Sequence, residues 1–200
     1  QRLIDKVTQD YRFNTILSKL LIERNFSNDE IWSIDNKKYI KNIFKNNTDF
    51  ESASSVIEKS YENKEKILIF GDYDVDGACS TSLFVNFFKS INQQCDFYIP
   101  DRIKDGYGPN VNLLNNLIKN NYKLIIFVDC GSNSNKEIDF LNENKIKSIV
   151  IDHHKLQGKI PNATSFINPL KTENILRWLS IASFSWFLIK SSRSFNVNTA

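Results

Sequence analysis

Three short clusters of acidic and imidazole side chains stand directly after apolar runs in the sequence. They are Gly71-Asp72-Tyr73-Asp74-Val75-Asp76-Gly77, Asp129-Cys130-Gly131 and Asp152-His153-His154. A short, continuous apolar run is typical of a strand that is buried on both faces. If these strands are parallel, their carboxyl ends meet at one edge of a sheet, where ligands bind in open α/β folds. The sequence therefore predicts that the three clusters converge on one site.

The predicted site brings together acids that would repel one another. It would contain five aspartates and both histidines of the chain: Asp72, Asp74, Asp76, Asp129, Asp152, His153 and His154. Packed carboxylates disfavour one another's charged form, so a raised pKa is expected for each. A bound divalent cation removes this repulsion, and mixed carboxylate and imidazole ligands suit Mn²⁺, Mg²⁺, Fe²⁺ or Zn²⁺. This many ligands favours two ions, which could activate a water molecule and hold a phosphoryl group.

Other interpretations explain parts of this pattern. An Asp after a strand is usually a helix cap, which would account for Asp129 alone but less well for three clusters that all follow strands. The spacing Asp72-x-Asp74-x-Asp76-Gly77 begins like an EF-hand loop, but the last ligand position holds Leu83 and the preceding element is a strand. The same residues resemble the nucleophile loop of haloacid-dehalogenase-type phosphatases, which would leave both histidines idle.

The elements around the clusters alternate between strand and helix patterns. This alternation predicts βαβ units, hence an α/β fold with a doubly wound, mostly parallel sheet. A helical N-terminal lead-in is expected over residues 1–65, with Asn14 as a helix cap. The predicted strands cover residues 67–70, 96–99, 124–128, 148–151 and 166–167, and the predicted helices cover 78–91, 111–120, 135–144 and 175–191.

The composition excludes several classes of protein. With 41% hydrophobic and 24% charged residues in 200, the chain has enough apolar material for one or two folded domains. No apolar run is long enough for a transmembrane helix. Three widely spaced cysteines without a CxxC pair argue against a disulfide scaffold or a zinc ribbon, so a reducing cytoplasm is expected. The net charge of +3 permits a nucleic-acid partner without demanding one.

The three clusters resemble the first three motifs of the DHH phosphoesterase superfamily, whose name repeats the last trio. Within it, the chain is most similar to the RecJ exonucleases, which act on single-stranded DNA. Ile99-Pro100-Asp101-Arg102, Asp105-Gly106-Tyr107-Gly108 and Ile167-Asn168-Pro169 add to the resemblance.

The resemblance implies a hydrolase of phosphodiesters that uses two Mn²⁺ or Mg²⁺ ions. The candidate ligands carried over by position are Asp72, Asp74, Asp76, Asp129 and His153. Asp129 would bridge the ions and His154 would face the phosphate, which makes these two the candidate catalytic residues. Asp152 would orient the histidines from behind.

The chain departs from the family pattern at two places. Many members have a His two residues before the first Asp, where this chain has Phe70, and Asp72 could take over that ligand position. The family's fourth motif, a later Asp, has no counterpart after Asn168, because residues 172–200 contain the single acid Glu173. The expected organisation is therefore a lead-in (1–65) and a truncated DHH domain (66–200) without the family's second domain.

The loop between the second strand and the next helix is the candidate nucleic-acid contact. Arg102 and Lys104 could bind phosphates, and Tyr107 could stack on a base. Alternatively, the loop is only a turn, with Gly106 and Gly108 supplying unusual φ angles and Tyr107 buried.

The expected function is 5′ to 3′ exonuclease activity on single-stranded DNA in repair and recombination. A phosphoesterase for small substrates (nanoRNA, cyclic dinucleotides or pyrophosphate) and a non-catalytic fragment of the fold are the alternatives. A monomer is expected, with a single-strand-binding protein or a helicase as partner.

Overall fold

The structure is a computed structural model, which describes residues 2–36, 48–171, 181–182, 185 and 188–189. Its centre is one sheet of five parallel strands in the order β2-β1-β3-β4-β5. The strands are β1 (Ile67–Gly71), β2 (Cys95–Tyr98), β3 (Leu124–Val128), β4 (Lys147–Ile151) and β5 (Ser165–Ile167). The last residues of β1, β3, β4 and β5 pair with one another, so these strands end level. The parallel α/β architecture predicted from the alternating pattern is confirmed.

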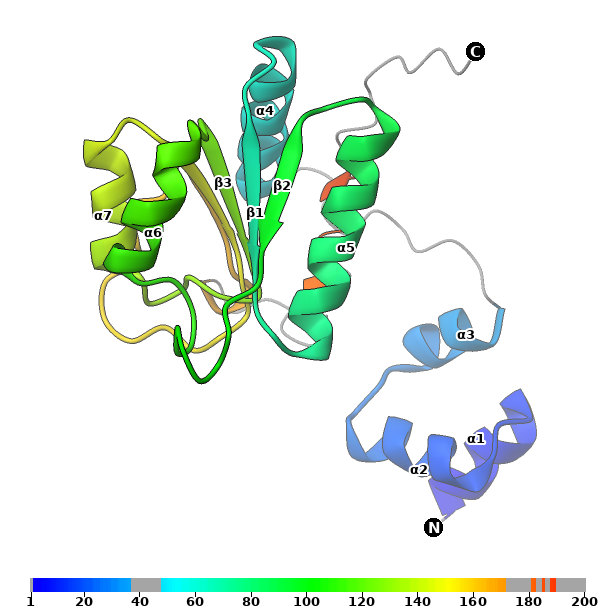
Figure 1. Ribbon diagram of the computed structural model, residues 1–200. Coiled ribbons are helices and arrows are strands. Elements are labelled where there is room, and N and C mark those ends of the chain that lie inside the picture. The colour runs from blue at the N-terminus through cyan, green and yellow to red at the C-terminus, as the bar shows by residue number, and fades with distance from the viewer. Residues whose placement is uncertain (1, 37–47, 172–180, 183–184, 186–187, 190–200) are drawn as a thin grey trace. The chain divides into compact units, whose positions relative to one another are not determined.

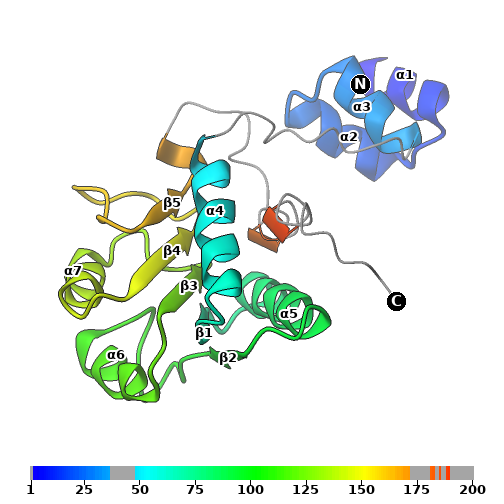
Figure 2. The same ribbon diagram turned by 90° about the horizontal axis from the view of Figure 1, so that it is seen from above.

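Helices cover both faces of this sheet (Figures 1 and 2). On one face lie α6 (Val111–Leu117), which continues into the short helix η1 (Ile118–Asn120), and α7 (Asn135–Glu143). On the other face lie α4 (Thr48–Glu62) and α5 (Val75–Ser90). A further short helix, η2 (Pro169–Lys171), follows β5.

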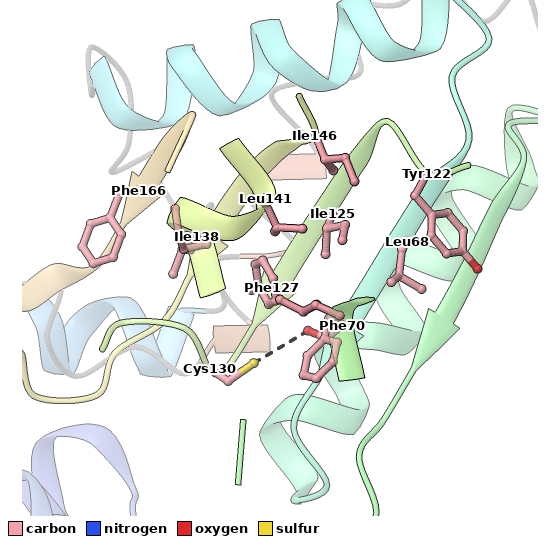
Figure 3. Close-up of a cluster of buried hydrophobic side chains, with 12 residues drawn as sticks. Leu68, Phe70, Tyr122, Ile125, Phe127, Cys130, Ile138, Leu141, Ile146 and Phe166 are labelled. Carbon is pink, nitrogen blue, oxygen red and sulfur yellow. Dashed lines mark hydrogen bonds between the residues drawn. The ribbon is translucent and has the colours of Figure 1, made fainter. Parts of the chain in front are cut away.

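The strands are apolar throughout because both of their faces are covered. All residues of β1 and β3 are buried. Figure 3 shows the core cluster between the sheet and α6 and α7, in which Leu68, Phe70, Ile125 and Phe127 meet side chains of the two helices. Phe70, which stands where many family members have His, is fully buried and stacks on the Tyr98 ring with 5.7 Å between centroids. It is therefore a core residue.

The N-terminal lead-in is helical, as expected, and forms a compact unit of its own over residues 1–45. It contains α1 (Arg2–Tyr11), α2 (Thr15–Glu23) and α3 (Asn28–Asn36) around the buried residues Val7, Leu21 and Ile31. Asn14 caps α2 as predicted, since its Oδ1 accepts a hydrogen bond of 2.8 Å from the N–H of Leu17.

The second compact unit begins at Asn46, earlier than the boundary expected between residues 65 and 66. The reason is that α4 packs on β5. Ser165 Oγ donates to the carbonyl of Asp49 at 3.1 Å, and Lys171 Nζ lies 2.9 Å from Asp49 Oδ1. Contacts between residues far apart in the chain thus place α4 with the sheet.

Most of the helix predicted over residues 175–191 lies outside the described residues. The described positions within it are helical, and Ile181, Ser185 and Leu188 are fully buried. Their spacing places them on one helical face. None of the helices in the described part of the chain is long and apolar enough to cross a membrane.

A glycine sets the distance between the end of β1 and the start of α5. A Cβ added at Gly77 would lie 2.5 Å from the carbonyl oxygen of Asp72 and 2.7 Å from its nitrogen. Gly to Ala in a helix normally stabilises by about 1 kcal/mol. We expect Gly77→Ala to destabilise instead, by about 1–3 kcal/mol, because backbone atoms must move. Urea unfolding measures this difference.

Gly158→Ala is the matched control for the Gly77 variant. A Cβ at Gly158 would meet nothing within 4 Å, although its φ of +90° disfavours an L side chain. Gly158→Ala should therefore lower the free energy of unfolding only through backbone strain, by about 1–2 kcal/mol. A Gly77→Ala protein as stable as the parent would contradict the close approach of α5 to β1.

Candidate metal centre

The first acidic cluster forms the tight turn from β1 into α5. Asp74 is the N-cap of α5, since its Oδ1 accepts a hydrogen bond of 2.9 Å from the N–H of Gly77. This cap starts the helix at Val75, three residues before the predicted start. Asp72 lies at the end of β1, is only 3% exposed and accepts a hydrogen bond of 2.8 Å from the N–H of Tyr73. The turn therefore fixes two carboxylates close to each other.

Asp129 follows β3 and carries the least satisfied carboxylate of the site. It is 1% exposed, and neither of its oxygens has a hydrogen-bond partner among the described residues. His153 Nε2 lies 3.3 Å from Oδ1 as an ion-pair contact. The backbone of Asp129 has a φ of +62°, in the left-handed region that Asp tolerates better than most residues. A buried carboxylate without hydrogen bonds is costly unless a cation binds it.

Asp152 follows β4 and organises the third cluster. Its Oδ1 accepts hydrogen bonds from the backbone N–H groups of His153 at 2.7 Å and His154 at 3.1 Å, and lies 2.7 Å from His154 Nδ1. Its Oδ2 accepts from the N–H of Ser132 at 2.8 Å. Donation of the Nδ1 proton to Asp152 leaves Nε2 of His154 free for a ligand. Asp152 thus contacts the side chain of His154 and, of His153, only the backbone N–H.

The three clusters converge, as the sequence predicted. Potential metal ligands form two sets, and within each set the ligand atoms all lie within 4.8 Å of one another. One set comes from Asp72, Asp74 and Asp129, and the other from Asp129, His153 and His154. Asp129 belongs to both sets. Carboxylate oxygens are suitable ligands for Mn²⁺ and Mg²⁺, and imidazole nitrogens suit transition metals such as Fe²⁺ and Zn²⁺. Asp129, whose oxygens accept no hydrogen bond among the described residues, is thus a candidate ligand in either set.

Burial does not raise the pKa of every acid, contrary to the expectation from sequence. It raises the pKa of Asp72, and it raises that of Asp129 to about 6, with the charges of Asp74 and Asp76 adding to the effect. The hydrogen bond from Gly77 lowers the pKa of Asp74. For Asp152, burial acts in the raising direction, but hydrogen bonds from His154 and Ser132 outweigh it and lower the pKa to about 2.

The pKa of each histidine is raised by the acid beside it. For His153 the largest cause is its contact with Asp129, and for His154 it is the hydrogen bond with Asp152. The two rings lie edge to face, with 5.2 Å between their centroids. Each histidine therefore has its own carboxylate partner at the edge of the sheet.

Asp76 has different partners from those expected of a ligand. Its two carboxylate oxygens accept hydrogen bonds from the backbone N–H groups of Ile181, at 2.8 Å, and Ala182, at 2.9 Å. It contributes to neither set of ligand atoms in the described part of the chain. The prediction from sequence could not anticipate these donors, because they lie in a distant segment.

The loop after β2 carries the candidate nucleic-acid residues. Asp105 holds it, since its Oδ2 accepts hydrogen bonds from the Tyr98 hydroxyl at 2.8 Å and the Asp101 N–H at 2.9 Å. Gly106 and Gly108 have φ angles of +81° and +70°, as a turn requires. Tyr107, however, is 56% exposed rather than buried.

Two of the three candidate side chains of this loop contact residues of the clusters, and the third lies elsewhere. The Tyr107 hydroxyl lies 3.2 Å from His154 Nδ1 and 3.3 Å from Nε2. The Arg102 guanidinium lies over the Tyr73 ring at 5.3 Å from its centroid. Lys104 instead lines a groove of about 570 Å³ beside α6, together with Asn112 and Asn116. Tyr107 and Arg102 thus contact residues of the clusters, and Lys104 has a separate location.

Two residues join the loops that carry the second and third clusters. Asn168 is buried, and its Nδ2 donates to Ser132 Oγ at 2.8 Å and to the carbonyl of His154 at 3.0 Å. From the sequence, Asn168 stands out only through the resemblance to the family, and Ser132 does not stand out. A small polar residue directly after Asp129-Cys130-Gly131 was the available signal for Ser132.

The charge of Asp129 should lower the stability of the metal-free protein. Its pKa of about 6 in the folded chain exceeds the ordinary ~3.9 of an unfolded chain. The charge therefore lowers the free energy of unfolding by the full amount above pH 6 and has no effect below about pH 4. We expect Asp129→Asn to raise the free energy of unfolding in EDTA by about 1–3 kcal/mol at pH 8. Urea unfolding at pH 8 and at pH 4 measures it.

Asp74→Ala and added Mn²⁺ are the controls for this prediction. The alanine variant loses a helix cap, so it should be less stable by about 1 kcal/mol under the same conditions. Mn²⁺ should raise the Tm of the parent through binding to the folded state and leave that of Asp129→Asn unchanged. A destabilised Asp129→Asn protein at pH 8 would contradict the unfavourable burial of this charge.

Comparisons with known proteins agree with the fold and the clusters. The family model "DHH family, N-terminal domain" matches residues 66–191. The RecJ single-stranded-DNA-specific exonuclease of Bacillus subtilis is 30% identical over 174 residues, covering 84% of this chain and 22% of the relative. The RecJ exonuclease of Haemophilus influenzae is 33% identical over 120 residues, covering 60% of this chain and 21% of the relative. The chain thus spans about a fifth of the length of these relatives.

Solved structures point to the same family. A crystal structure of exonuclease RecJ bound to manganese matches with a TM-score of 0.67 and 25% identity, over 73% of this chain and 37% of the other. RecJ from Thermus thermophilus in complex with Mn²⁺ matches in fold, with a TM-score of 0.73 and 19% identity, over 96% of this chain and 27% of the other. With its three motifs on the ends of parallel strands and the family model matching more than half of its length, the chain belongs to the DHH family.

Proposed function

We propose that this chain carries the metal centre of a hydrolase that cleaves phosphodiester bonds in single-stranded DNA, from the 5′ end. The observation that supports it most is the carboxylate of Asp129, which is buried, accepts no hydrogen bond from the described residues and belongs to both sets of candidate ligand atoms. The similarity to RecJ exonucleases supports single-stranded DNA as the substrate. A role in DNA repair and recombination is part of the same proposal.

The metal ligands are assigned from the two sets of atoms. Asp72, Asp74 and Asp129 would hold one Mn²⁺ or Mg²⁺ ion, and Asp129 and His153 would hold the second. When bound, such a pair of ions supplies Lewis acidity and lowers the pKa of a bound water molecule. Asp129 would neutralise part of the charge of both ions, so its loss should matter most among these acids.

The protein's own side chains hold and orient the substrate. His154, with Nδ1 turned to Asp152, presents Nε2 to the phosphate and can donate a proton there when it is charged. Arg102 over the Tyr73 ring provides a cation for a neighbouring phosphate. Tyr107 is exposed beside His154, so its ring can stack on a base while its hydroxyl contacts the imidazole. Lys104 could contact a more distant phosphate from its groove.

The remaining expectations about the protein stay predictions. They are the preference for a single strand over a duplex, the monomeric state, the cytoplasmic location and a single-strand-binding protein or helicase as partner. A small-substrate phosphoesterase uses the same metal chemistry, so only a comparison of substrates separates it from the exonuclease.

Hydrolysis should depend on a divalent cation and on a single strand. We expect the protein, expressed at its full genomic length, to degrade 5′-labelled single-stranded DNA with Mn²⁺, to stop in EDTA and to recover when Mn²⁺ is restored. Asp129→Ala should abolish the reaction at every Mn²⁺ concentration. Release of labelled mononucleotide from single-stranded DNA, blunt duplex of the same sequence and a dinucleotide measures the preference.

Each alternative has its own outcome in this assay. Equal rates on duplex and single strand would contradict strand selectivity. Cleavage of the dinucleotide alone would identify a small-substrate phosphoesterase, and no cleavage at any Mn²⁺ concentration would identify a non-catalytic member of the fold. Activity that persists in EDTA would contradict the metal centre itself.

Two substitutions at Tyr107 separate its ring from its hydroxyl. Tyr107→Ala should weaken single-strand binding by about 1–3 kcal/mol if the ring stacks on a base. Tyr107→Phe keeps the ring and removes only the hydroxyl that contacts His154, so it should bind like the parent while its kcat and pH profile change. Fluorescence anisotropy at several salt concentrations measures binding. An alanine variant with unchanged affinity and a lowered Tm would assign Tyr107 a structural role.

A further inference from the structure

Asn168 is the first residue after β5, and its side chain is buried against the loop of the third cluster. It is 5% exposed, and it donates to the carbonyl of His154. Strand β5 ends level with β4, and the N–H of Asp152 donates to the carbonyl of Ile167 at 3.0 Å. Asn168 therefore follows β5 at the level where Asp152 follows β4, which is the edge of the sheet where the clusters converge.

The side-chain amide of Asn168 is fully engaged with protein groups. An asparagine side chain offers two N–H donors and one carbonyl acceptor. Its Nδ2 donates to Ser132 Oγ at 2.8 Å and to the carbonyl of His154 at 3.0 Å. Its Oδ1 accepts a hydrogen bond of 2.8 Å from the N–H of Leu170. Both donors are used, so none is left for a phosphate.

The hydrogen bonds of Asn168 close a ring around the peptide of His154. Ser132 donates its N–H to Asp152 Oδ2 at 2.8 Å. Asp152 Oδ1 accepts from the N–H of His154 and lies 2.7 Å from its Nδ1. Asn168 joins the two remaining groups, the Ser132 hydroxyl and the His154 carbonyl. The loops that follow β3, β4 and β5 are therefore linked to one another around one histidine.

This ring holds His154 more completely than it holds His153. The N–H of His154 is bound by Asp152 and its carbonyl by Asn168, so its backbone is fixed on both sides. Of His153, the ring holds only the N–H, and the imidazole of that residue faces Asp129. The backbone conformation of a residue limits the rotamers that its side chain can adopt. Asn168 thus restricts where the imidazole of His154 points.

We infer that Asn168 is a positioning residue for His154, which keeps Nδ1 on Asp152 and Nε2 toward the substrate. The inference deepens the proposed function and rests on it where turnover is measured. None of the hydrogen bonds of the Asn168 side chain goes to a side chain assigned to an ion. Loss of the amide should therefore misdirect the imidazole and leave the ions in place.

The state of the His154 ring can be measured without metal or substrate. The chain contains two histidines, so ¹⁵N labelling of histidine gives two ring signals, which His153→Gln assigns. In EDTA, the ring shifts of the parent should show the proton of His154 on Nδ1, facing Asp152. In Asn168→Ala the ratio of the Nδ1–H to the Nε2–H form should fall at least about threefold, because a hydrogen bond to a charged acceptor is weakened. An unchanged ratio would overturn the inference.

Turnover tests whether Asn168 acts through His154. In the protein at its full genomic length, with Mn²⁺ and single-stranded DNA, Asn168→Ala should lower kcat about 10–100-fold and leave KM and the Mn²⁺ affinity within about twofold. In a His154→Ala background the same substitution should lower kcat by less than about threefold, because the residue it acts through is absent. An equally large loss in both backgrounds would overturn the inference. So would an unchanged kcat with a lowered Tm, which would give Asn168 a structural role alone.

Two further variants complete the test. Asn142→Ala on α7 also removes a side-chain donor from a backbone carbonyl, that of Asn162 at 3.0 Å, but lies outside the ring, so neither measurement should change. Ser132→Ala keeps the N–H to Asp152 and loses only the hydroxyl, so its kcat should fall about 3–10-fold. It replaces Asn168→Ala in both measurements if that variant does not fold. A parent without hydrolysis would contradict the proposed function, and the ring signals of His154 would still decide the inference.

Discussion

The burial of one carboxylate without hydrogen-bond donors is the constraint that the rest of the site satisfies. The strands β1, β3 and β4 are parallel and end level, so the residues after them are brought to one edge of the sheet whatever their charge. Asp129 lies in the middle of that edge, is 1% exposed and accepts no hydrogen bond among the described residues, although His153 Nε2 lies 3.3 Å from its Oδ1. Water cannot compensate a charge placed so deeply, whereas a bound cation would.

The other acids at this edge differ in how far backbone donors engage them. Asp152 is fully engaged with the backbone and side chain of the third cluster, and the pKa of this group is lowered to about 2. Asp76 is engaged with a distant backbone segment. Asp74 has one oxygen in a helix cap and still lies within reach of Asp129. Backbone donors therefore engage each of these acids, and Asp72 as well, whereas the carboxylate of Asp129 accepts no hydrogen bond among the described residues.

The sequence was sufficient to predict the sheet and the convergence of the clusters. Apolar runs such as Ile67–Phe70 report burial on both faces, and strand direction then decides where the following residues lie. It was not sufficient for the partners of Asp76, for the opposite pKa shifts of Asp129 and Asp152, or for the packing of α4 on β5. Each of these depends on a contact between positions distant in the chain, which periodicity and spacing do not encode. The sequence also could not show that Lys104 lies apart from Arg102 and Tyr107, because neighbouring residues in a loop need not face the same way.

The most direct test of this view of the site is whether metal ions bind to the carboxylate of Asp129. Crystals of the protein grown with Mn²⁺ and measured at the manganese absorption edge give the ion positions independently of the protein atoms. Two anomalous peaks, each about 2.0–2.3 Å from a different oxygen or a shared oxygen of Asp129, are predicted. A single peak that Asp129 does not contact, or an Asp129 carboxylate bound only by protein donors, would contradict the account.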